Sequence, residues 1–465
     1  MVAVRLGIDI ACRAAHQASL ADEQDRFLWT GRRLRTTPSD LTELWDALPA
    51  GTDPADVLVV MEPTRNAWVP LAAWFRRRGA RVVLVPPERS ADLRKYYAKH
   101  AKSDRLDSRL LARLPLLHPD GLHTEPGLGP GDALKRAAKL HSTLTHRRTQ
   151  CLARLDTLLE ILGPAWRAAI GAELGSRTVL KFLAAGYADP HTVQRLGRTR
   201  LARFCYRHSR GAWGEPMAEA ILAAAAETLQ LWADGEELDY PDLAEDIAIE
   251  ARLALQLTEE IKDLDERTAL LLHQADPEGI LTSAPGVAQI TAAAILGRLG
   301  DPTRFASLAG VRAFTGLIPT LDASGLTGRH GGPTKRGDAV LRQALFMAAG
   351  QARRIDPTRA AKYHRLMVDA GKHHNSALCH IATTLLNRII ACWRAGQPYV
   401  LRDVDGTPVT REQARAIIAE RYTIPKDLRA QRRTTDSGTG RRNKRSRSAP
   451  STGPSTTDAT TVPAA

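Results

Sequence analysis

Four acidic residues stand where carboxylates could act together on a phosphate. Asp9 lies inside the strand-like segment VRLGIDI, and Glu62 follows the apolar run DVLVVM. Asp104 and Asp107, in KSDRLDSRL, are three residues apart and share one face of a predicted helix. Converging carboxylates repel one another unless cations neutralise them, and oxygen-only ligands suit Mg²⁺ or Mn²⁺. Two such ions activate an attacking oxygen and stabilise a leaving oxygen in phosphoryl transfer.

Each acid alone has an ordinary structural explanation, because strand aspartates cap turns and paired helix acids usually face water. The order of the four acids along the chain is more informative. An Asp in the first strand, a Glu ending the fourth and paired Asp on a late helix resembles the ribonuclease-H-like arrangement. In particular, it looks like the version found in Holliday-junction resolvases.

A second candidate is Ser324, in the glycine-rich basic stretch LDASGLTGRHGGPTKRGDAVLR over 321–342. It is either a turn residue or a nucleophile. A serine hydroxyl attacks only when a base or metal activates it. The nearest histidine, His330, is no obvious partner, whereas a carboxylate-bound metal from another domain would supply the activation. Glycines let the backbone approach a phosphate closely, and basic side chains hold it. The candidate nucleic-acid contacts are Gly286, Gly325, Arg329, Thr334, Lys335, Arg336 and Arg342.

The elements that must position these residues begin with an α/β domain over 1–118. Alternating residues predict a first strand over 4–10, and two further strands follow with a turn near 22–25. A helix follows TPSDLTELWDAL, with Ser39 or Asp40 as its N-terminal cap. DVLVVMEPT is typical of a strand buried on both faces. A helix over 67–78, a strand in ARVVLVPP and a helix over 103–114 complete a predicted mixed sheet with helices.

The composition then changes. Residues 119–132 are rich in Gly and Pro and predict a linker, and residues 133–275 predict a helical, coiled-coil region. One apolar seam contains Leu134, Ala137, His141, Leu144, Arg148, Cys151, Leu155, Leu158 and Leu162, and is interrupted at His141 and Arg148. A second contains Ala254, Leu257, Ile261, Leu264, Thr268 and Leu271. Three interpretations are open. The seams form a coiled coil within one chain, they form one between subunits, or they belong to two ordinary amphipathic helices of a bundle. Residues 163–243 between them predict an alanine-rich helical insertion.

The last regions predicted are a compact, mostly helical domain over 276–400 and an extension with a basic tail over 401–465. From about residue 424 the composition is typical of disorder. Between Lys426 and Arg447 there are nine Lys or Arg and two Asp. The chain carries a net charge of +14, which favours a polyanionic partner. Five scattered cysteines indicate reduced thiols, and KHHNSALCH matches no familiar zinc spacing. Without a membrane span or signal peptide, we expect a cytoplasmic protein.

The order PG…TAA…GD…RF…GL.P…SG…G…TKRGD..LR resembles the C-terminal domain of the DEDD-type insertion-sequence transposases. These enzymes are relatives of the pilin-gene DNA invertases and are also called bridge-RNA-guided recombinases. GIDIA, VMEPT and KSDRLDSRLLA match the N-terminal motifs of this family. The resemblance covers about residues 4–118 and 276–395.

The resemblance implies an RNA-guided DNA transposase that cuts and rejoins donor and target DNA. Asp9, Glu62, Asp104 and Asp107 match the acidic tetrad, and Ser324 matches the nucleophile that forms a 5′-phosphoserine beside bound Mg²⁺ or Mn²⁺. The implied partners are donor DNA, target DNA and a structured bridge RNA. Exchange of four strands implies a homo-oligomer, a dimer that assembles to a tetramer, in a bacterial cytoplasm and bound to the nucleoid. Two alternatives are a metal-dependent junction nuclease without serine chemistry and a non-enzymatic nucleic-acid-binding protein.

Overall fold

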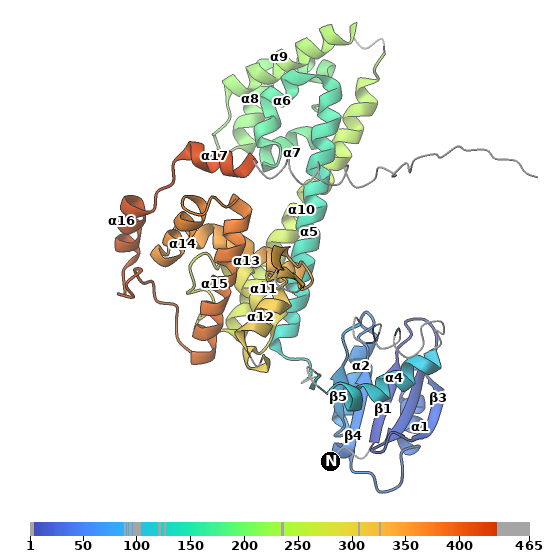
Figure 1. The fold of residues 1–465 in the computed structure, drawn as a ribbon. Helices are drawn as coiled ribbons and strands as arrows, with labels where there is room; N and C mark the ends of the chain where they lie inside the picture. Colours follow the sequence, from blue (N-terminus) through green and yellow to red (C-terminus); the bar gives the residue numbers. More distant parts are fainter. Residues whose placement is uncertain are drawn as a thin grey trace, which may run out of the picture. The chain divides into compact units, whose positions relative to one another are not determined.

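The computed structural model describes residues 4–87, 90, 92, 95, 104–119, 122–124, 127–233, 237–305, 307–324 and 327–434. The chain forms two compact units that divide between Gly129 and Pro130. The first is an α/β unit and the second is almost entirely helical (Figure 1). This agrees with the predicted α/β N-terminal domain and the mostly helical remainder.

The first unit contains a six-stranded sheet in the order β3-β2-β1-β4-β5-β6. β1 pairs antiparallel with β2, and β2 pairs antiparallel with β3. β4 and β5 continue the sheet parallel to β1, and β6 is an antiparallel edge strand. This mixed order fits the ribonuclease-H-like arrangement implied by the resemblance. The strands are β1 (Val4–Asp9), β2 (His16–Asp22), β3 (Phe27–Leu34), β4 (Val57–Met61), β5 (Arg81–Leu84) and β6 (His123–Thr124).

The two faces of this sheet are covered by different helices. Side chains such as Leu6, Ile8 and Val59 form one core with α1 (Pro38–Asp46) and α2 (Trp68–Arg77). The opposite face carries Leu58 and Val60 and packs against α4 (Asp104–Leu117). Both faces of β4 are therefore buried, as its continuous apolar run predicts. A short 3₁₀ turn, η1 (Pro54–Asp56), precedes β4.

The N-terminal cap of α1 differs from the prediction. Thr37, rather than Ser39 or Asp40, adopts extended backbone angles, and its side chain accepts a hydrogen bond from the Asp40 amide. Pro38 occupies the first helical position, which its fixed φ angle favours. The cap therefore lies one residue before the proline.

In the second unit, two long helices run side by side, α5 (Pro130–Leu162) and α10 (Tyr240–Ala275). His141 Nε2 lies 3.3 Å from Asp265 Oδ1, and Arg148 Nε donates to Thr258 Oγ1 at 2.7 Å. These contacts show that the helices are antiparallel and that they pair within the chain. The two polar interruptions of the first seam thus meet polar partners. A supercoiled geometry stays a prediction.

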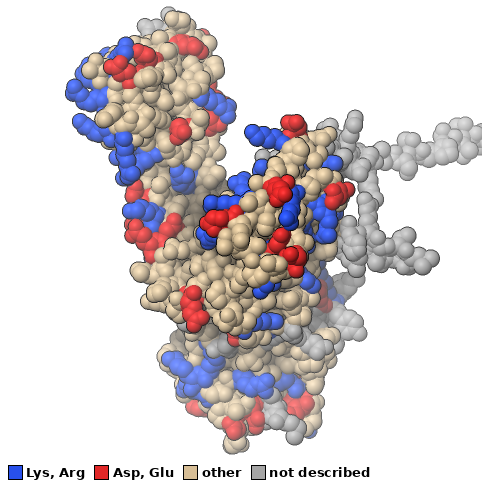
Figure 2. Space-filling view, turned by 90° about the vertical axis from the view of Figure 1, so that its left-hand side faces the viewer, with Lys and Arg blue, Asp and Glu red and all other residues tan. Residues whose placement is uncertain are grey.

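The insertion between these helices contains α6 (Pro164–Ile170), α7 (Arg177–Ala184), α8 (Pro190–His208) and α9 (Glu215–Leu231), with the 3₁₀ turn η2 (Gly171–Glu173). Its core includes Trp166, Phe182 and Leu201, together with the adjoining ends of α5 and α10. The insertion therefore has a hydrophobic core of its own. Figure 2 shows Lys and Arg gathered along one edge of the upper lobe, where Figure 1 draws these helices.

The C-terminal part packs helices around a third core that includes Leu134, Leu345 and Leu385. It begins with α11 (Gln289–Leu299), the 3₁₀ turn η4 (Pro302–Arg304) and α12 (Leu308–Thr315). A hairpin of β7 (Pro319–Ser324) and β8 (Thr327–Pro333) follows. Then come α13 (Ala339–Ala352), α14 (Pro357–Met367), α15 (His374–Ala395), α16 (Arg411–Arg421) and α17 (Lys426–Thr434).

The helix α17 corrects the prediction of disorder from about residue 424. Ile424 packs against the C-terminal core, and Leu428 is half-buried, so apolar anchors hold this basic segment. Arg432 lies over Gly371, whose added Cβ would come within 3.2 Å of the guanidinium. The predicted disorder of 435–465 falls outside the described residues.

None of the described helices is both long and apolar enough to cross a membrane.

Candidate active site

Asp9 and Glu62 lie next to each other at one end of the sheet. β1 and β4 run parallel, and Ile8 pairs with Met61, so the next residues in register are Asp9 and Glu62. Paired positions on neighbouring strands share a face. Glu62 alternates with Leu58 and Val60, which face α4, so both carboxylates belong to the α4 face. Both residues are half-buried.

The helix α4 crosses this face antiparallel to β1. Arg5 Nε donates to the Ala112 carbonyl at 2.9 Å, and Ser19 Oγ, opposite Gly7, lies 2.8 Å from Ser108 Oγ. The helix therefore runs from its first turns near the end of β1 to its last turn near the start. Asp107 precedes Ser108 and is only 8% exposed. Asp104 begins α4, and its side chain falls outside the described residues.

The close approach of α4 depends on Gly7. A Cβ on this residue would lie 2.1 Å from the Ser108 carbonyl oxygen and 2.4 Å from the Ala112 amide nitrogen. No larger side chain fits without moving the helix. Glu62 is oriented separately, because Ser90 Oγ donates to its Oε2 at 2.5 Å. The sequence pattern did not point to Gly7 or Ser90 as positioning residues.

Ser324 ends β7 and is paired with Thr327 at the tip of a β-hairpin. The sequence suggested a loop here, but 319–324 and 327–333 form antiparallel strands. The candidate Gly325 lies outside the described residues, and the side chains of Ser324 and Arg329 are likewise not described.

The TKRGD segment forms a folded turn directly after this hairpin. The Thr334 amide donates to the Ile318 carbonyl at 2.9 Å, and the Lys335 amide donates to the Gly316 carbonyl at 3.1 Å. Lys335 has a positive φ of 56°, and its side chain and that of Arg336 are exposed. Both cations are therefore displayed by a backbone held at several points.

Arg342 and Gly286 have structural roles that the sequence did not indicate. The Arg342 guanidinium donates to the carbonyls of Thr315 at 3.1 Å and Lys335 at 3.3 Å, so it braces the TKRGD turn. Gly286 has a φ of 79°, and an added Cβ would come within 2.3 Å of the Ala348 carbonyl oxygen. The turn at Gly286 thus packs directly on α13.

Comparison with known families covers the segments that carry both sets of candidates. A DEDD-type IS110 transposase model matches residues 6–164, and the model of the IS116/IS110/IS902 transposase family matches residues 278–365. The 43.6 kDa protein of insertion element IS110 from Streptomyces coelicolor is 28% identical over 86% of this chain and 96% of its own length. The chain belongs to the IS110/IS116 family of transposases. It is therefore an enzyme that cuts and rejoins DNA.

Two further relatives are similar to this transposase. The 44.8 kDa protein of insertion element IS116 from Streptomyces clavuligerus is 24% identical over 81% of this chain and 91% of its own length. The protein y4pF/y4sB of Sinorhizobium fredii is 31% identical over 38% of this chain and 47% of its own length. Residues 165–277, which hold nearly all of the insertion and the whole of α10, lie between the two matched family segments.

The donor chemistry of the transposase fits the divalent metal use of DEDD domains. Asp9, Glu62 and Asp107 offer hard carboxylate oxygens at one end of one face, the donor type that Mg²⁺ and Mn²⁺ prefer. In the part of the chain that the structure describes, no three His, Cys, Asp or Glu side chains are arranged to hold a metal ion. The three acids thus lie at one end of this face, which we call the acidic edge, without forming a closed cage.

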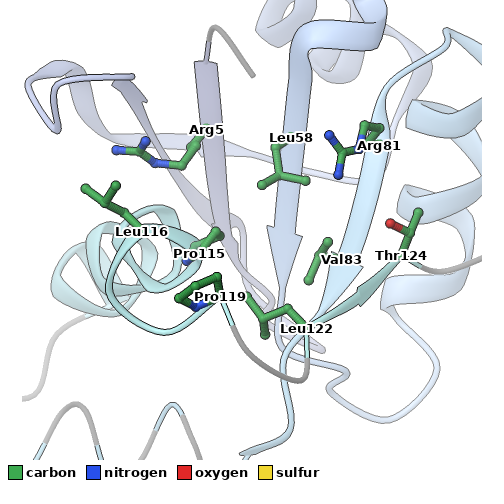
Figure 3. Close-up of a pocket in the computed structure, with 9 residues that line it drawn as sticks. All are labelled: Arg5, Leu58, Arg81, Val83, Pro115, Leu116, Pro119, Leu122 and Thr124. Atoms are coloured by element: carbon green, nitrogen blue, oxygen red, sulfur yellow. The ribbon is translucent and has the colours of Figure 1, made fainter. Parts of the chain in front are cut away.

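A cavity of about 300 Å³ lies at the other end of the transposase sheet (Figure 3). Arg5, Leu58 and Arg81 line it from the first residues of their strands, and Pro115 and Leu116 line it from the last turn of α4. Asp9 is the last residue of β1 and Glu62 directly follows β4, so both lie at the opposite ends of those strands. The cavity is therefore separate from the acidic edge.

Asp338 is a further positioning residue that the sequence analysis missed. It caps α13 by accepting from the Leu341 amide at 2.9 Å, and it accepts from Arg298 Nε on α11 at 2.5 Å. Its amide donates to the Phe314 carbonyl at 3.0 Å, which fixes the end of the TKRGD turn. The sequence did contain a sign of this role, because an Asp directly before a helical pattern is typical of an N-terminal cap.

Proposed function

We propose that this transposase cuts and rejoins DNA through a covalent 5′-phosphoserine at Ser324, with Asp9, Glu62, Asp104 and Asp107 holding Mg²⁺. One observation carries the proposal. The two matched family segments contain the four acids and the serine, respectively, and Asp9 and Glu62 stand side by side on the face that α4 covers. The acids belong to the first unit and Ser324 to the second.

The serine step conserves the energy of the DNA bond. Ser324 Oγ attacks the phosphorus, the bond from phosphorus to the 3′ oxygen breaks, and the 3′ oxygen leaves with a proton. In the second step the 3′-hydroxyl of another strand attacks the phosphoserine and releases Ser324. The number of phosphoester bonds is unchanged, so rejoining requires no ATP. This economy suits a recombinase and is unnecessary for a nuclease.

The chain's own residues would position the reacting phosphate. Lys335 and Arg336 are exposed cations on the braced TKRGD turn, and such cations offset charge that develops on phosphate oxygens. Arg342 braces that turn through its hydrogen bonds to the Thr315 and Lys335 carbonyls. When bound, Mg²⁺ supplies Lewis-acid activation of the oxygens that exchange at phosphorus.

Sequence selection is assigned in this proposal to a structured bridge RNA that pairs with donor and target DNA. When base pairing reads the sequence, the protein recognises duplex shape and backbone. Exchange of four strands requires several serines, so we propose a homodimer that assembles to a tetramer. Because its substrate is DNA, we propose that the enzyme acts on the bacterial nucleoid.

The decisive experiment is Ser324→Ala. The substitution removes one oxygen, so we expect a change in the free energy of unfolding within about 0.5 kcal/mol. Labelled donor and target DNA are incubated with the transposase, co-purified RNA and Mg²⁺, then separated on a denaturing gel. The wild type should give a protein-linked band that protease removes, and Ser324→Ala should give none.

A matched control is Ser376→Ala, which removes an exposed hydroxyl in the first turn of α15. It should retain the protein-linked band. If the band survives in Ser324→Ala, the nucleophile lies elsewhere. If the wild type cuts without any adduct, the enzyme is a metal-dependent junction nuclease instead.

A further inference from the structure

The insertion carries a concentrated positive charge on α8 and the turn after it. Residues 190–214 contain six arginines and no Asp or Glu. Neither matched family segment reaches this region, which lies between residues 164 and 278. The charge therefore belongs to a part of the chain to which the family comparison assigns no role.

The arginines gather on one side of the helix. Arg200, Arg203 and Arg207 are spaced three and four residues apart and are exposed, and Tyr206 lies on the same side. The opposite side carries Leu201 and Cys205, which are buried in the core of the insertion. Exposed Arg210 continues the charge in the following turn. We call Arg200, Arg203, Tyr206, Arg207 and Arg210 the α8 face.

Packing beneath the helix holds this face in place. Phe204 packs on Tyr187 and on His208, with ring centroids 5.3 and 4.4 Å apart. At the start of the segment, a break in helical geometry at Gly197 precedes Arg198, which forms ion pairs with Glu215 and Glu219 of α9. Arg200, Arg203 and Arg207 are thus presented by a supported helix, and Arg210 by the turn that follows it.

The cations of the α8 face are not neutralised by neighbouring acids. Among the described residues, Arg203, Arg207 and Arg210 form no ion pair or side-chain hydrogen bond, while Arg200 donates only to backbone carbonyls of its own helix. Lys181 Nζ, 3.5 Å from His208 Nδ1, adds a further charge nearby. Burial first, and then Lys181 and Arg207, lower the pKa of His208.

Tyr206 adds an aromatic surface in the middle of the positive charge. It is 63% exposed, although most large apolar side chains of the insertion are buried. Gly211 lies against one part of its ring, where an added Cβ would come within 3.4 Å. Much of the ring remains open to a partner. An exposed aromatic among arginines is the combination that binds unstacked bases together with their phosphates.

We infer that the α8 face docks an unpaired loop of RNA, with the arginines on phosphates and a base stacked on Tyr206. Duplex DNA, the substrate of a transposase, keeps its base faces stacked and offers nothing to the ring. RNA loops display unstacked bases, and aromatic rings and guanidinium planes recognise them. The inference rests on the proposed function only in requiring an RNA partner. It names where that RNA is held.

The test is a binding titration of the full chain in EDTA, so that strand cleavage plays no part. The probes are a fluorescent single-stranded RNA 20-mer, the same sequence as single-stranded DNA, and duplex DNA. We expect the triple variant Arg203→Gln/Arg207→Gln/Arg210→Gln to bind the RNA at least about tenfold more weakly. The slope of log affinity against log salt should fall by about 2, since each contact to a single strand contributes about 0.7.

The matched control, Arg167→Gln/Arg252→Gln/Lys262→Gln, removes three exposed charges of the same unit that lie on α6 and α10 and are ion-paired with acids outside α8. It should bind the RNA like the wild type. Tyr206→Ala should weaken RNA binding about tenfold and leave duplex binding unchanged, whereas Tyr206→Phe should retain the ring and the affinity. Circular dichroism establishes that each variant is folded.

The inference is overturned if the triple variant binds RNA normally or if the control weakens binding equally. Equal losses for RNA and duplex DNA in Tyr206→Ala would also contradict it, as would tighter binding of single-stranded DNA than of RNA. Because the assay needs neither metal nor Ser324, a negative result leaves the serine proposal intact. A failed adduct assay, conversely, leaves this binding result standing.

Discussion

At the scale of single residues, the acidic edge combines a buried carboxylate with two half-buried ones. Asp107 is 8% exposed, and Asp9 and Glu62 lie in adjacent register on the face that α4 covers. Removing carboxylates from water is costly without compensation, and neighbouring like charges add to that cost. A bound cation offsets both the loss of hydration and the repulsion between the carboxylates. The proposed metal site therefore predicts opposite effects of charge removal on activity and on stability.

We expect Asp9→Asn and Asp107→Asn each to abolish divalent-ion binding and DNA cleavage. The melting temperature should be unchanged or raised, because repulsion and desolvation are relieved while shape is kept. Calorimetric titration with Mn²⁺ and a cleavage assay provide the measurements. Glu43→Gln, an exposed acid on α1 paired with Arg32, is the control and should behave like the wild type. Normal turnover by Asp9→Asn would rule out the tetrad assignment.

At the scale of elements, the position of α4 decides whether its two aspartates reach the sheet edge. The helix lies against the sheet at Gly7, where the Ser108 carbonyl and the Ala112 amide occupy the space of a Cβ. Arg5 and Ser19 add hydrogen bonds to the helix on either side of this contact. One glycine therefore controls a distance on which the proposed metal site depends.

Gly7→Ala should displace α4 and destabilise the first unit by about 3 kcal/mol, since backbone atoms cannot yield to the added methyl group. Hydrogen exchange in peptides covering 104–117 should accelerate, and cleavage should fall. The control is Gly350→Ala within α13, where no atom lies within 4 Å of the added Cβ. That substitution should be neutral or should stabilise by up to about 1 kcal/mol. Unchanged exchange in α4 would contradict the packing argument.

The long helix pair shows a different use of an element. The two polar residues of its seam, His141 and Arg148, both have polar partners. His141 pairs with Asp265, and Arg148 donates to Thr258 and to the Gly175 carbonyl. Polar groups at seam positions set the register and orientation of paired helices. These contacts are compatible with one antiparallel alignment, which carries the insertion at one end and the C-terminal core at the other.

At the scale of the whole molecule, positive charge is concentrated in three places. These are the TKRGD turn, the α8 face and the C-terminal tail, of which only the part up to Thr434 is described. Within that part, α17 is packed, with Arg432 over Gly371. The tail thus divides into an ordered basic helix and a terminal segment, 435–465, with five Lys or Arg and two Asp.

Two truncations should separate the contribution of 435–465 to nucleic-acid binding from the contribution of α17 to stability. A chain ending at Thr434 should bind nucleic acid more weakly, with a smaller salt dependence of affinity, while its melting temperature stays unchanged. A chain ending at Pro425 should also melt at a lower temperature, because α17 no longer covers the C-terminal part. Binding titrations at several salt concentrations and thermal melts measure both effects. A large fall in melting temperature for the Thr434 chain would show that 435–465 is structural.

The sequence by itself determined the local elements and the types of residue that carry the chemistry. Alternation placed β1, a continuous apolar run placed β4, and heptad-like spacing placed α5 and α10, because each pattern reflects burial of one face. The order of Asp9, Glu62, Asp104 and Asp107 indicated a ribonuclease-H-like domain, and the motifs around Ser324 indicated the family. These signals lie within short stretches of chain.

Only the tertiary structure decided which distant residues meet. The register of β1 with β4 made Asp9 and Glu62 neighbours, and the packing of α4 on Gly7 brought the first turns of that helix to the same end of the sheet. Arg342 was predicted to contact phosphate, which stays a prediction, and folding also brings it two carbonyls of a turn that it braces. The α8 face emerged only when burial of Leu201 and Cys205 directed the arginines outward. Such outcomes depend on which surfaces pack together, and packing between distant segments leaves no local pattern to read.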